Sequence, residues 1–275
     1  MKSAARKSNV TRLRPAKPRL KTVRNRIDAA EWQARVDLAA AFRLTALVGW
    51  TDMLGTHISC RVPGSNDQFL INPYGLLFEE ITASSLIKCD INGAKLSESP
   101  YEVNFAGFTI HSAIHMGRHD AHAVMHVHNG YGVAVSAQKD GLLPITQKAL
   151  TAPLNQLRYH DYEGVAHDLT ERERLVRDLG AHDAMVLRNH GLLTCGATIQ
   201  QAFNTMYQLE MSCRAQVDAM AARTELTMPG ENVLAHTAHL YQPGTRRPYG
   251  VLEWPAMLRL LEAKGKNSGY PAYWQ

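Results

Sequence analysis

The stretch Ala-Val-Met-His-Val-His-Asn-Gly, residues 123–130, decides the centre of the fold because it joins an apolar run to two histidines. Alternate residues of a strand project from one face, so a strand here points His126 and His128 into the same space. Neutral imidazole is a preferred ligand of Zn²⁺ and other divalent transition metals. Two histidines at this spacing can equally be packed side chains, and the spacing alone leaves both interpretations open.

A third histidine strengthens the metal interpretation. His190 follows the apolar run at residues 184–187 and precedes Gly191, a pattern typical of a strand that ends in a turn. Three protein ligands with one open position is the arrangement of catalytic rather than structural zinc sites. We therefore predict a divalent metal held by His126, His128 and His190, with Zn²⁺ as first choice and Fe²⁺, Mn²⁺ or Ni²⁺ compatible with the same ligands.

Hydrophobic periodicity outward from this strand predicts hairpins mixed with helices. The expected helices cover residues 28–47 (with Asp28 as N-cap), a short stretch from 82, and residues 102–117, 170–179, 198–222 and 254–264. The other expected strands cover residues 57–62, 68–72, 86–91 and 184–188. Hairpins without strict β-α-β alternation predict a three-layer α/β/α domain, or a related α+β domain, with a largely antiparallel central sheet. The sequence contains no glycine-rich nucleotide-binding loop, so no nucleotide cofactor is expected.

The charge of the chain is unevenly distributed. Ten of its 30 Lys and Arg residues lie in residues 1–26, which contain no acid, and this leaves 20 basic against 25 acidic residues in the remainder. The segment lacks apolar periodicity, so we predict a disordered basic arm. Such an arm can contact nucleic acid or anionic lipid, but a solvated tail without a specific partner is the simpler expectation. The domain is then expected at 27–222, followed by a C-terminal extension at 223–275 that packs on the domain or on a neighbouring subunit.

Length and composition fit one large globular domain, since the chain has 275 residues of which 45% are hydrophobic. No segment reaches the ~18 consecutive apolar residues that span a bilayer, and no apolar core follows the first basic residues. We therefore expect a cytoplasmic protein without a membrane partner. Its four cysteines show no Cys-x-x-Cys spacing, which predicts reduced core residues rather than disulfides or thiolate metal ligands.

Four blocks of sequence carry a family resemblance. They are Leu-Gly-Thr-His-Ile-Ser at 54–59, Ile-Asn-Pro-Tyr-Gly at 71–75, Arg-His-Asp-Ala-His-Ala-Val-Met-His-Val-His at 118–128 and Arg-Asn-His-Gly-Leu at 188–192. Together they resemble the class II aldolase/adducin family, to which fuculose-phosphate aldolase and ribulose-phosphate 4-epimerase belong, over roughly residues 30–220. Further blocks at 82–86, 141–145, 159–162 and 269–271 resemble the adducin head-domain branch in particular.

The resemblance implies a three-layer α/β/α fold, commonly assembled as a ring-shaped homotetramer with active sites between subunits. In the sugar-phosphate aldolases and epimerases of the family, three histidines that match His126, His128 and His190 hold zinc or a similar ion. That ion acts as a Lewis acid and stabilises the enediolate formed when a carbon–carbon bond breaks. The loops that surround the substrate in those enzymes match Gly55, Thr56, Asn72 and Gly75. His57 is expected to reach the mouth of the same site, or else to pair with backbone at a strand edge.

One position departs from the catalytic members of the family. Their acid/base glutamate corresponds to Gly107, and the serines beside it correspond to Phe105 and Ala106, so phosphorylated sugars are less expected as substrates. His111, one helical turn after Gly107, is one candidate for the missing acid/base group, and a packed histidine is the alternative. Tyr159 is a second catalytic candidate, because a tyrosine from a neighbouring subunit protonates the enolate in relatives, and interface packing is its alternative role.

These features predict a metal-dependent aldolase-type lyase that acts on a small hydroxy-carbonyl, sugar-like substrate. The alternative is a non-catalytic, adducin-head-like oligomeric module that binds the actin cytoskeleton and keeps the fold for structural reasons. A third hypothesis is another metal-dependent reaction, such as decarboxylation or oxygen-dependent cleavage, because one fold hosts many sites. Neither nucleic acid nor a membrane is an expected partner.

Overall fold

A seven-stranded sheet forms the middle of the molecule in the computed structural model, which describes residues 23–275 apart from 167, 243, 246 and 249. The strands are β1 (His57–Arg61), β2 (Gln68–Ile71), β3 (Ile87–Asp90), β4 (Ala123–Val127), β5 (Arg158–His160), β6 (Ala184–Leu187) and β7 (Gly191–Gly196). Their order in the sheet is β3-β2-β1-β4-β7-β6-β5. The pair β5–β6 is parallel, whereas the other neighbouring pairs are antiparallel. The prediction of a largely antiparallel central sheet is confirmed.

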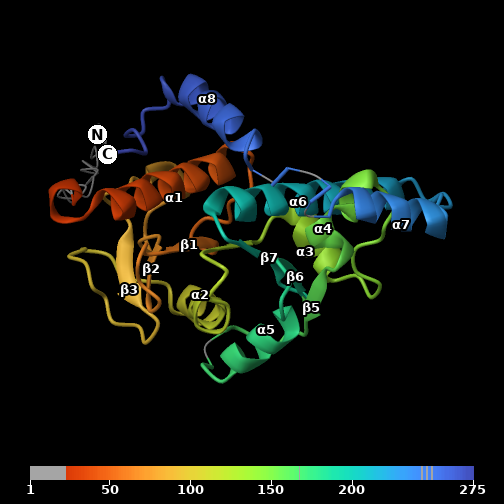
Figure 1. Cartoon of the computed structure of the whole chain (residues 1–275), viewed down its shortest axis with the longest axis horizontal. Helices are drawn as coiled ribbons and strands as arrows, with labels where there is room; N and C mark the ends of the chain where they lie inside the picture. Colours follow the sequence, from red (N-terminus) through yellow and green to blue (C-terminus); the bar gives the residue numbers. More distant parts are fainter. Residues whose placement is uncertain (1–22, 167, 243, 246, 249) are drawn as a thin grey trace, which may run out of the picture.

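Helices cover both faces of this sheet (Figure 1). One layer holds α1 (Ala29–Leu47), α3 (Gly130–Ser136), α4 (Ala152–Asn155), α6 (Ile199–Ala221), α7 (Glu231–Leu240) and α8 (Glu253–Gly265). The other layer holds α2 (Phe105–Gly117) and α5 (Glu171–Leu179). Short 3-10 turns lie at Arg24–Arg26, Phe78–Glu80 and Gln147–Leu150. The predicted three-layer α/β/α fold is confirmed.

The alternating side chains of the strands divide the core into two apolar layers. In β4, Ala123, Met125 and Val127 belong to the core under α1 and α6, whereas Val124 belongs to the core under α2 and α5. His126 shares the α2-facing side with Val124 and is fully buried. The imidazole of His126 therefore lies on the side of the sheet that faces α2.

A capping side chain precedes each of the two long helices. Asp28 accepts a hydrogen bond from Glu31 N at 2.7 Å at the start of α1. Thr198 accepts one from Gln201 N at 3.2 Å at the start of α6. Each side chain satisfies an amide group that a first helical turn leaves without a partner. The predicted starts of both helices are confirmed.

Other predicted elements are wrong or missing. The helix expected from Thr82 is a turn instead, because Ser85 Oγ accepts from Thr82 N and donates to Thr82 O, both at 2.9 Å. The helix expected at 254–264 is present as α8, but the preceding helix α7 was not predicted. β5 was not predicted, because a strand of three residues is too short to show an alternating hydrophobic pattern. β7 begins at Gly191, where the sequence analysis expected only a turn.

The residues after α6 return to the first helix of the same chain. α8 packs on α1 (Figure 1). At the end of the chain, Ala83 N donates to Tyr273 O and Ser84 N donates to Gln275 O, both at 2.8 Å. The last residues therefore contact the turn that precedes β3.

The predicted basic arm falls largely on residues 1–22, which lie outside the described part of the chain. The domain boundaries expected after residues 26 and 222 stay predictions. No helix among the described residues combines the length and the apolar character needed to cross a membrane.

Candidate metal centre

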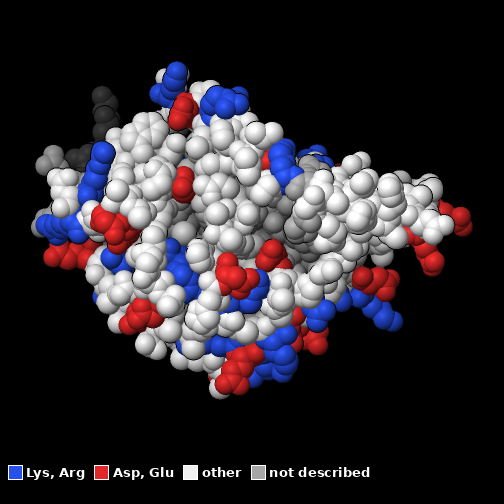
Figure 2. Space-filling model, in the orientation of Figure 1, with Lys and Arg blue, Asp and Glu red and all other residues white. Residues whose placement is uncertain are grey.

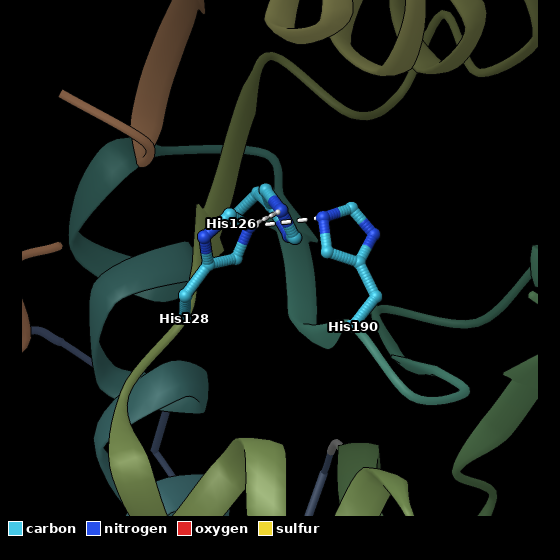
Figure 3. Close-up of side chains that lie close together, drawn as sticks. All are labelled: His126, His128 and His190. Carbon is cyan, nitrogen blue, oxygen red and sulfur yellow. Dashed lines mark hydrogen bonds between the residues drawn. The ribbon is translucent and has the colours of Figure 1, made fainter. Parts of the chain in front are cut away.

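Three histidines converge where β4 ends beside the turn between β6 and β7 (Figure 3). His126 lies in β4, His128 follows the last residue of that strand, and His190 lies in the turn. The Nε2 atoms of His126 and His128 are 2.8 Å apart, and those of His128 and His190 are 2.9 Å apart. One ligand atom from each ring lies within 4.8 Å of the other two. The structure thus brings the three predicted ligands together.

The backbone places His190 at this point. Antiparallel pairing sets Val127 opposite Leu192, so the turn before β7 lies beside the end of β4. Asn189 adopts the left-handed conformation with φ of 55°, which asparagine tolerates better than most residues. Gly191 passes so close to β4 that a Cβ atom would lie 2.5 Å from Val127 O. A larger residue at this position cannot fit unless one of the strands moves.

The hydrogen bonds of two rings leave their facing nitrogens without protons. His126 Nδ1 donates to Leu192 O at 2.9 Å, and His128 Nδ1 donates to a carboxylate oxygen of Asp52 at 3.0 Å. Each neutral ring then carries its lone pair on Nε2. Lone pairs that face each other at 2.8 Å repel unless a cation lies between them. Because a tetrahedral Zn²⁺ holds nitrogen ligands about 3.3 Å apart, small movements of the rings fit this donor set to a divalent ion.

Burial keeps the rings of His126 and His190 in the neutral form that binds a metal. Burial is the main cause that lowers the pKa of His126, and the nearby rings of His190 and His57 lower it further. Burial, and then His128, lower the pKa of His190 to about 4. Metal ligation requires an unprotonated imidazole nitrogen. Both rings can therefore accept a metal at neutral pH without first losing a proton.

Asp52, which was not among the predicted site residues, contacts His128 from behind the triad. It lies between α1 and β1, and its side chain is 54% exposed. Gly55 N donates to Asp52 O at 2.7 Å, which closes the loop that holds the carboxylate against His128. A carboxylate behind a ligand histidine orients the ring and raises its basicity. The one sequence signal was an acid shortly before the block at 54–59.

Replacement of Asp52 by asparagine is expected to lower metal affinity about tenfold while the protein stays folded. The amide keeps the size of the side chain but loses the charge that stabilises the Nδ1–H of His128, and the exposure of the carboxylate keeps the effect modest. Competition with a colorimetric chelator measures the affinity. Asp67→Asn, which changes an exposed acid in the turn between β1 and β2, is the control, and an equal effect there would show a general influence of charge.

His57 stands between the triad and the predicted acid/base candidate His111. The ring centroids of His57 and His126 are 5.0 Å apart. His57 Nδ1 lies 2.9 Å from His111 Nε2, and His111 Nδ1 lies 2.5 Å from Ser59 Oγ. His111 is fully buried, and both of its ring nitrogens are engaged. Its contact with the triad therefore runs through His57.

Tyr159, the second catalytic candidate, lies on the other side of the sheet. Its ring packs against the core under α1 and α6, and its hydroxyl accepts a hydrogen bond from Leu142 N at 3.0 Å. The guanidinium of Arg188 lies 4.3 Å from the centre of the ring. Tyr162 lies near the triad, since its ring centroid is 6.4 Å from that of His190. Sequence alone could not assign the two tyrosines to opposite sides.

The predicted substrate-binding residues differ in their surroundings. Gly55 touches the triad directly, since a Cβ atom there would lie 3.3 Å from His128 Nδ1. Thr56 and Asn72 are buried, and neither Thr56 Oγ1 nor Asn72 Oδ1 has a hydrogen-bond partner in the described part of the chain. Buried polar atoms normally have partners, so these two atoms suit a bound molecule. Gly75 has φ of 114°, which suits glycine, and it packs on Tyr101.

The buried histidines near the triad predict a loss of stability in acid. Burial, and then the charge of Arg61, lower the pKa of His115 to about 3, and burial also lowers the pKa of His57 and of His111. The unfolded chain binds protons on these rings below about pH 6.5, whereas the folded chain does not. This stability is therefore fully present above about pH 6.5 and is lost as the pH falls toward the folded pKa.

For His115 alone, the expected loss between pH 7 and pH 5 is about 2 kcal/mol. Chemical denaturation at pH 7, 6 and 5 measures the free energy of unfolding. The variant His115→Gln should lose about that much less over the same interval. A free energy of unfolding that stays constant from pH 7 to pH 5 would contradict the prediction.

The fold and the site together define a class of protein. Residues 36–217 match the family described as Class II Aldolase and Adducin N-terminal domain. This match covers more than half of the chain and includes the triad, so the chain belongs to that family.

Individual relatives and structures agree with this assignment. The structure of an aldolase II superfamily protein from Pseudomonas syringae is 47% identical, with a TM-score of 0.86 over 92% of this chain and 99% of that one. L-fuculose 1-phosphate aldolase from Glaciozyma antarctica is 28% identical, with a TM-score of 0.75 over 88% of this chain and 93% of that one. Alpha-adducin of Rattus norvegicus is 37% identical over 89% of this chain, which spans 35% of the adducin.

Proposed function

We propose that this chain is a metal-dependent aldolase-type lyase that cleaves a small hydroxy-carbonyl, sugar-like substrate. The observation that carries the proposal is the convergence of three Nε2 atoms, from His126, His128 and His190. Two of these rings are oriented from behind, by Leu192 O and by Asp52. The family match and the similarity to L-fuculose 1-phosphate aldolase support the same class of reaction.

A divalent ion in the triad supplies Lewis-acid stabilisation of the negative charge that develops on substrate oxygens as a carbon–carbon bond breaks, worth several kcal/mol. The chain itself binds and orients the substrate. Gly55 has no side chain, and this lets the Asp52 carboxylate approach His128 closely. Thr56 Oγ1 and Asn72 Oδ1 are the proposed hydrogen-bond partners of substrate hydroxyl groups. Because Phe105 offers no hydroxyl, we propose an unphosphorylated substrate.

We propose Zn²⁺ as the ion, because an all-imidazole set with one open position is typical of catalytic zinc. The same ligands bind Fe²⁺, Mn²⁺ and Ni²⁺, so elemental analysis of the purified protein decides among them.

A homo-oligomer, which we propose to be a tetramer, is supported by apolar side chains exposed on one end of the molecule. In Figure 2 the face of the projecting end over α7 carries few charged side chains, and acidic groups lie at its tip. Met228, Val233 and Leu240 in and before α7 are 48%, 58% and 51% exposed. Exposed apolar side chains grouped in this way are typical of subunit contacts. Light scattering on the purified protein tests the proposal.

A non-catalytic module is the second candidate function. The similarity to alpha-adducin favours it, and so does Gly107, since glycine has no group that can move a proton. This candidate keeps the fold but requires no turnover.

A screen for aldehyde release tests the first proposal. The metal-loaded full chain is incubated with unphosphorylated hydroxy-carbonyl compounds, and the aldehyde is measured by coupled reduction. Release that disappears on chelation and in His128→Ala is the expected result. A metal-loaded protein that cleaves none of the compounds but sediments with actin filaments would support the adducin-like module instead.

A further inference from the structure

The ring of His57 occupies the space that a side chain at position 107 would need. Gly107 lies in the first turn of α2, where Asn104 caps the helix. A Cβ atom on Gly107 would lie 2.6 Å from His57 Cδ2, and 2.9 Å from both Cγ and Nε2 of that ring. Carbon contacts this short are not tolerated. The imidazole of His57 can therefore occupy its observed position only because residue 107 has no side chain.

His57 reaches the metal centre from β1. Its Cα atom pairs with that of His126 in the antiparallel ladder between β1 and β4, and both side chains project toward α2. Their rings lie 5.0 Å apart with an interplanar angle of 32°. His57 is only 3% exposed, so it fills the region between the triad and the first turn of α2. That region is the one that a side chain at Gly107 would otherwise occupy.

A buried hydrogen-bonded row holds His57 from behind. Its Nδ1 lies 2.9 Å from His111 Nε2, His111 Nδ1 lies 2.5 Å from Ser59 Oγ, and Ser59 Oγ lies 2.8 Å from His115 Nε2. A hydroxyl group can donate to one ring and accept from the other, so the row is continuous. Ser59, His111 and His115 are fully buried. A buried row of this kind fixes the orientation of its last ring.

The last ring of the row, His57, has one nitrogen without a hydrogen bond to any described residue. His57 Nε2 has no hydrogen-bond partner in the described ranges, whereas Nδ1 of the same ring does. A ring held on one side and open on the other suits a group that meets a ligand.

We propose that His57 is the substrate-contacting group on the side of the centre where position 107 has no side chain. Through Nε2 it hydrogen-bonds an oxygen of the hydroxy-carbonyl substrate, while Ser59, His111 and His115 act as positioning residues. This inference rests on the proposed lyase function and deepens it. Gly107 is then an adaptation to His57 and not the loss of a working site.

The test measures metal content and ligand binding separately, with the cobalt-loaded full chain and hydroxyacetone as the probe. The absorption spectrum of bound Co²⁺ reports the dissociation constant of hydroxyacetone. His57→Phe keeps a ring against Gly107 but removes both nitrogens. Gly107→Ala moves His57 and removes no polar group, so it tests the same contact if His57→Phe fails to fold. Gly130→Ala is the matched control, because a Cβ atom there meets nothing within 4 Å.

We expect about one metal per chain in every variant. The dissociation constant of hydroxyacetone should rise about tenfold or more in His57→Phe and Gly107→Ala, and less than about twofold in Gly130→Ala. Ser59→Ala should weaken hydroxyacetone binding at unchanged metal content, and Ser59→Thr, which keeps the hydroxyl, should restore it. That rescue separates positioning from packing.

Two results would overturn the inference in distinguishable ways. Full metal content with an unchanged hydroxyacetone dissociation constant in both His57→Phe and Gly107→Ala rejects the role of His57 and leaves the lyase proposal standing. A wild-type protein that binds no metal, or that binds metal but no hydroxyacetone, rejects the lyase proposal and the inference with it.

Discussion

Replacement of His128 by alanine is expected to remove the bound metal while the protein stays folded. Its Nε2 lies 2.8 Å from that of His126 and 2.9 Å from that of His190, so it is the middle ligand of the three. Its side chain is 20% exposed, so alanine leaves a gap open to water and not a cavity in the core. Loss of a ligand should weaken binding by more than the roughly 10–100-fold that loss of an orienting partner costs.

Elemental analysis of protein purified without chelator or a histidine tag measures the effect. Wild type should carry about one metal per chain and His128→Ala close to none, with unchanged circular dichroism. His119→Ala is the control, because His119 is an exposed histidine in the loop before β4. A full metal equivalent in His128→Ala would refute the ligand assignment. A wild type without metal would favour the adducin-like module.

The triad was predictable because its sequence signals are local. An apolar run that leads into His126 and His128 indicates a strand whatever the rest of the chain does. An apolar run before His190 and a glycine after it indicate a strand end in the same way. The strand signals do not say that the two ends meet. That follows from the pairing of β4 with β7, a contact between distant segments.

The contacts that support the triad join distant segments, and these contacts were therefore not predicted. Asp52 reaches His128 from an exposed loop that has no periodic pattern. His57 and Gly107 meet only because α2 packs across β1. The sequence identified Gly107 as a departure from the family, but the ring that fills the space above it became visible only in the folded chain.

Replacement of Gly191 by alanine is expected to damage both the metal site and the fold. The added Cβ atom would lie 2.5 Å from Val127 O and 3.2 Å from His128 Cδ2. Val127 O is a backbone atom of β4, so it can move only if the strand moves. The start of β7 must then shift away from β4, which displaces His190 relative to His128. We expect metal affinity to fall about 100-fold and the free energy of unfolding to fall by about 1–3 kcal/mol.

Chelator competition and chemical denaturation measure the two effects in the same preparation. Gly230→Ala serves as the control, because its Cβ atom would meet nothing within 4 Å at the start of α7. If Gly191→Ala bound metal as tightly as wild type, the close approach of β7 to β4 would not set the geometry of the ligands. If stability fell but metal affinity did not, the glycine would serve the sheet alone. A loss of both, absent from the control, is the result that the contact with Val127 O requires, since the added atom presses on the strand that carries His126 and leads into His128.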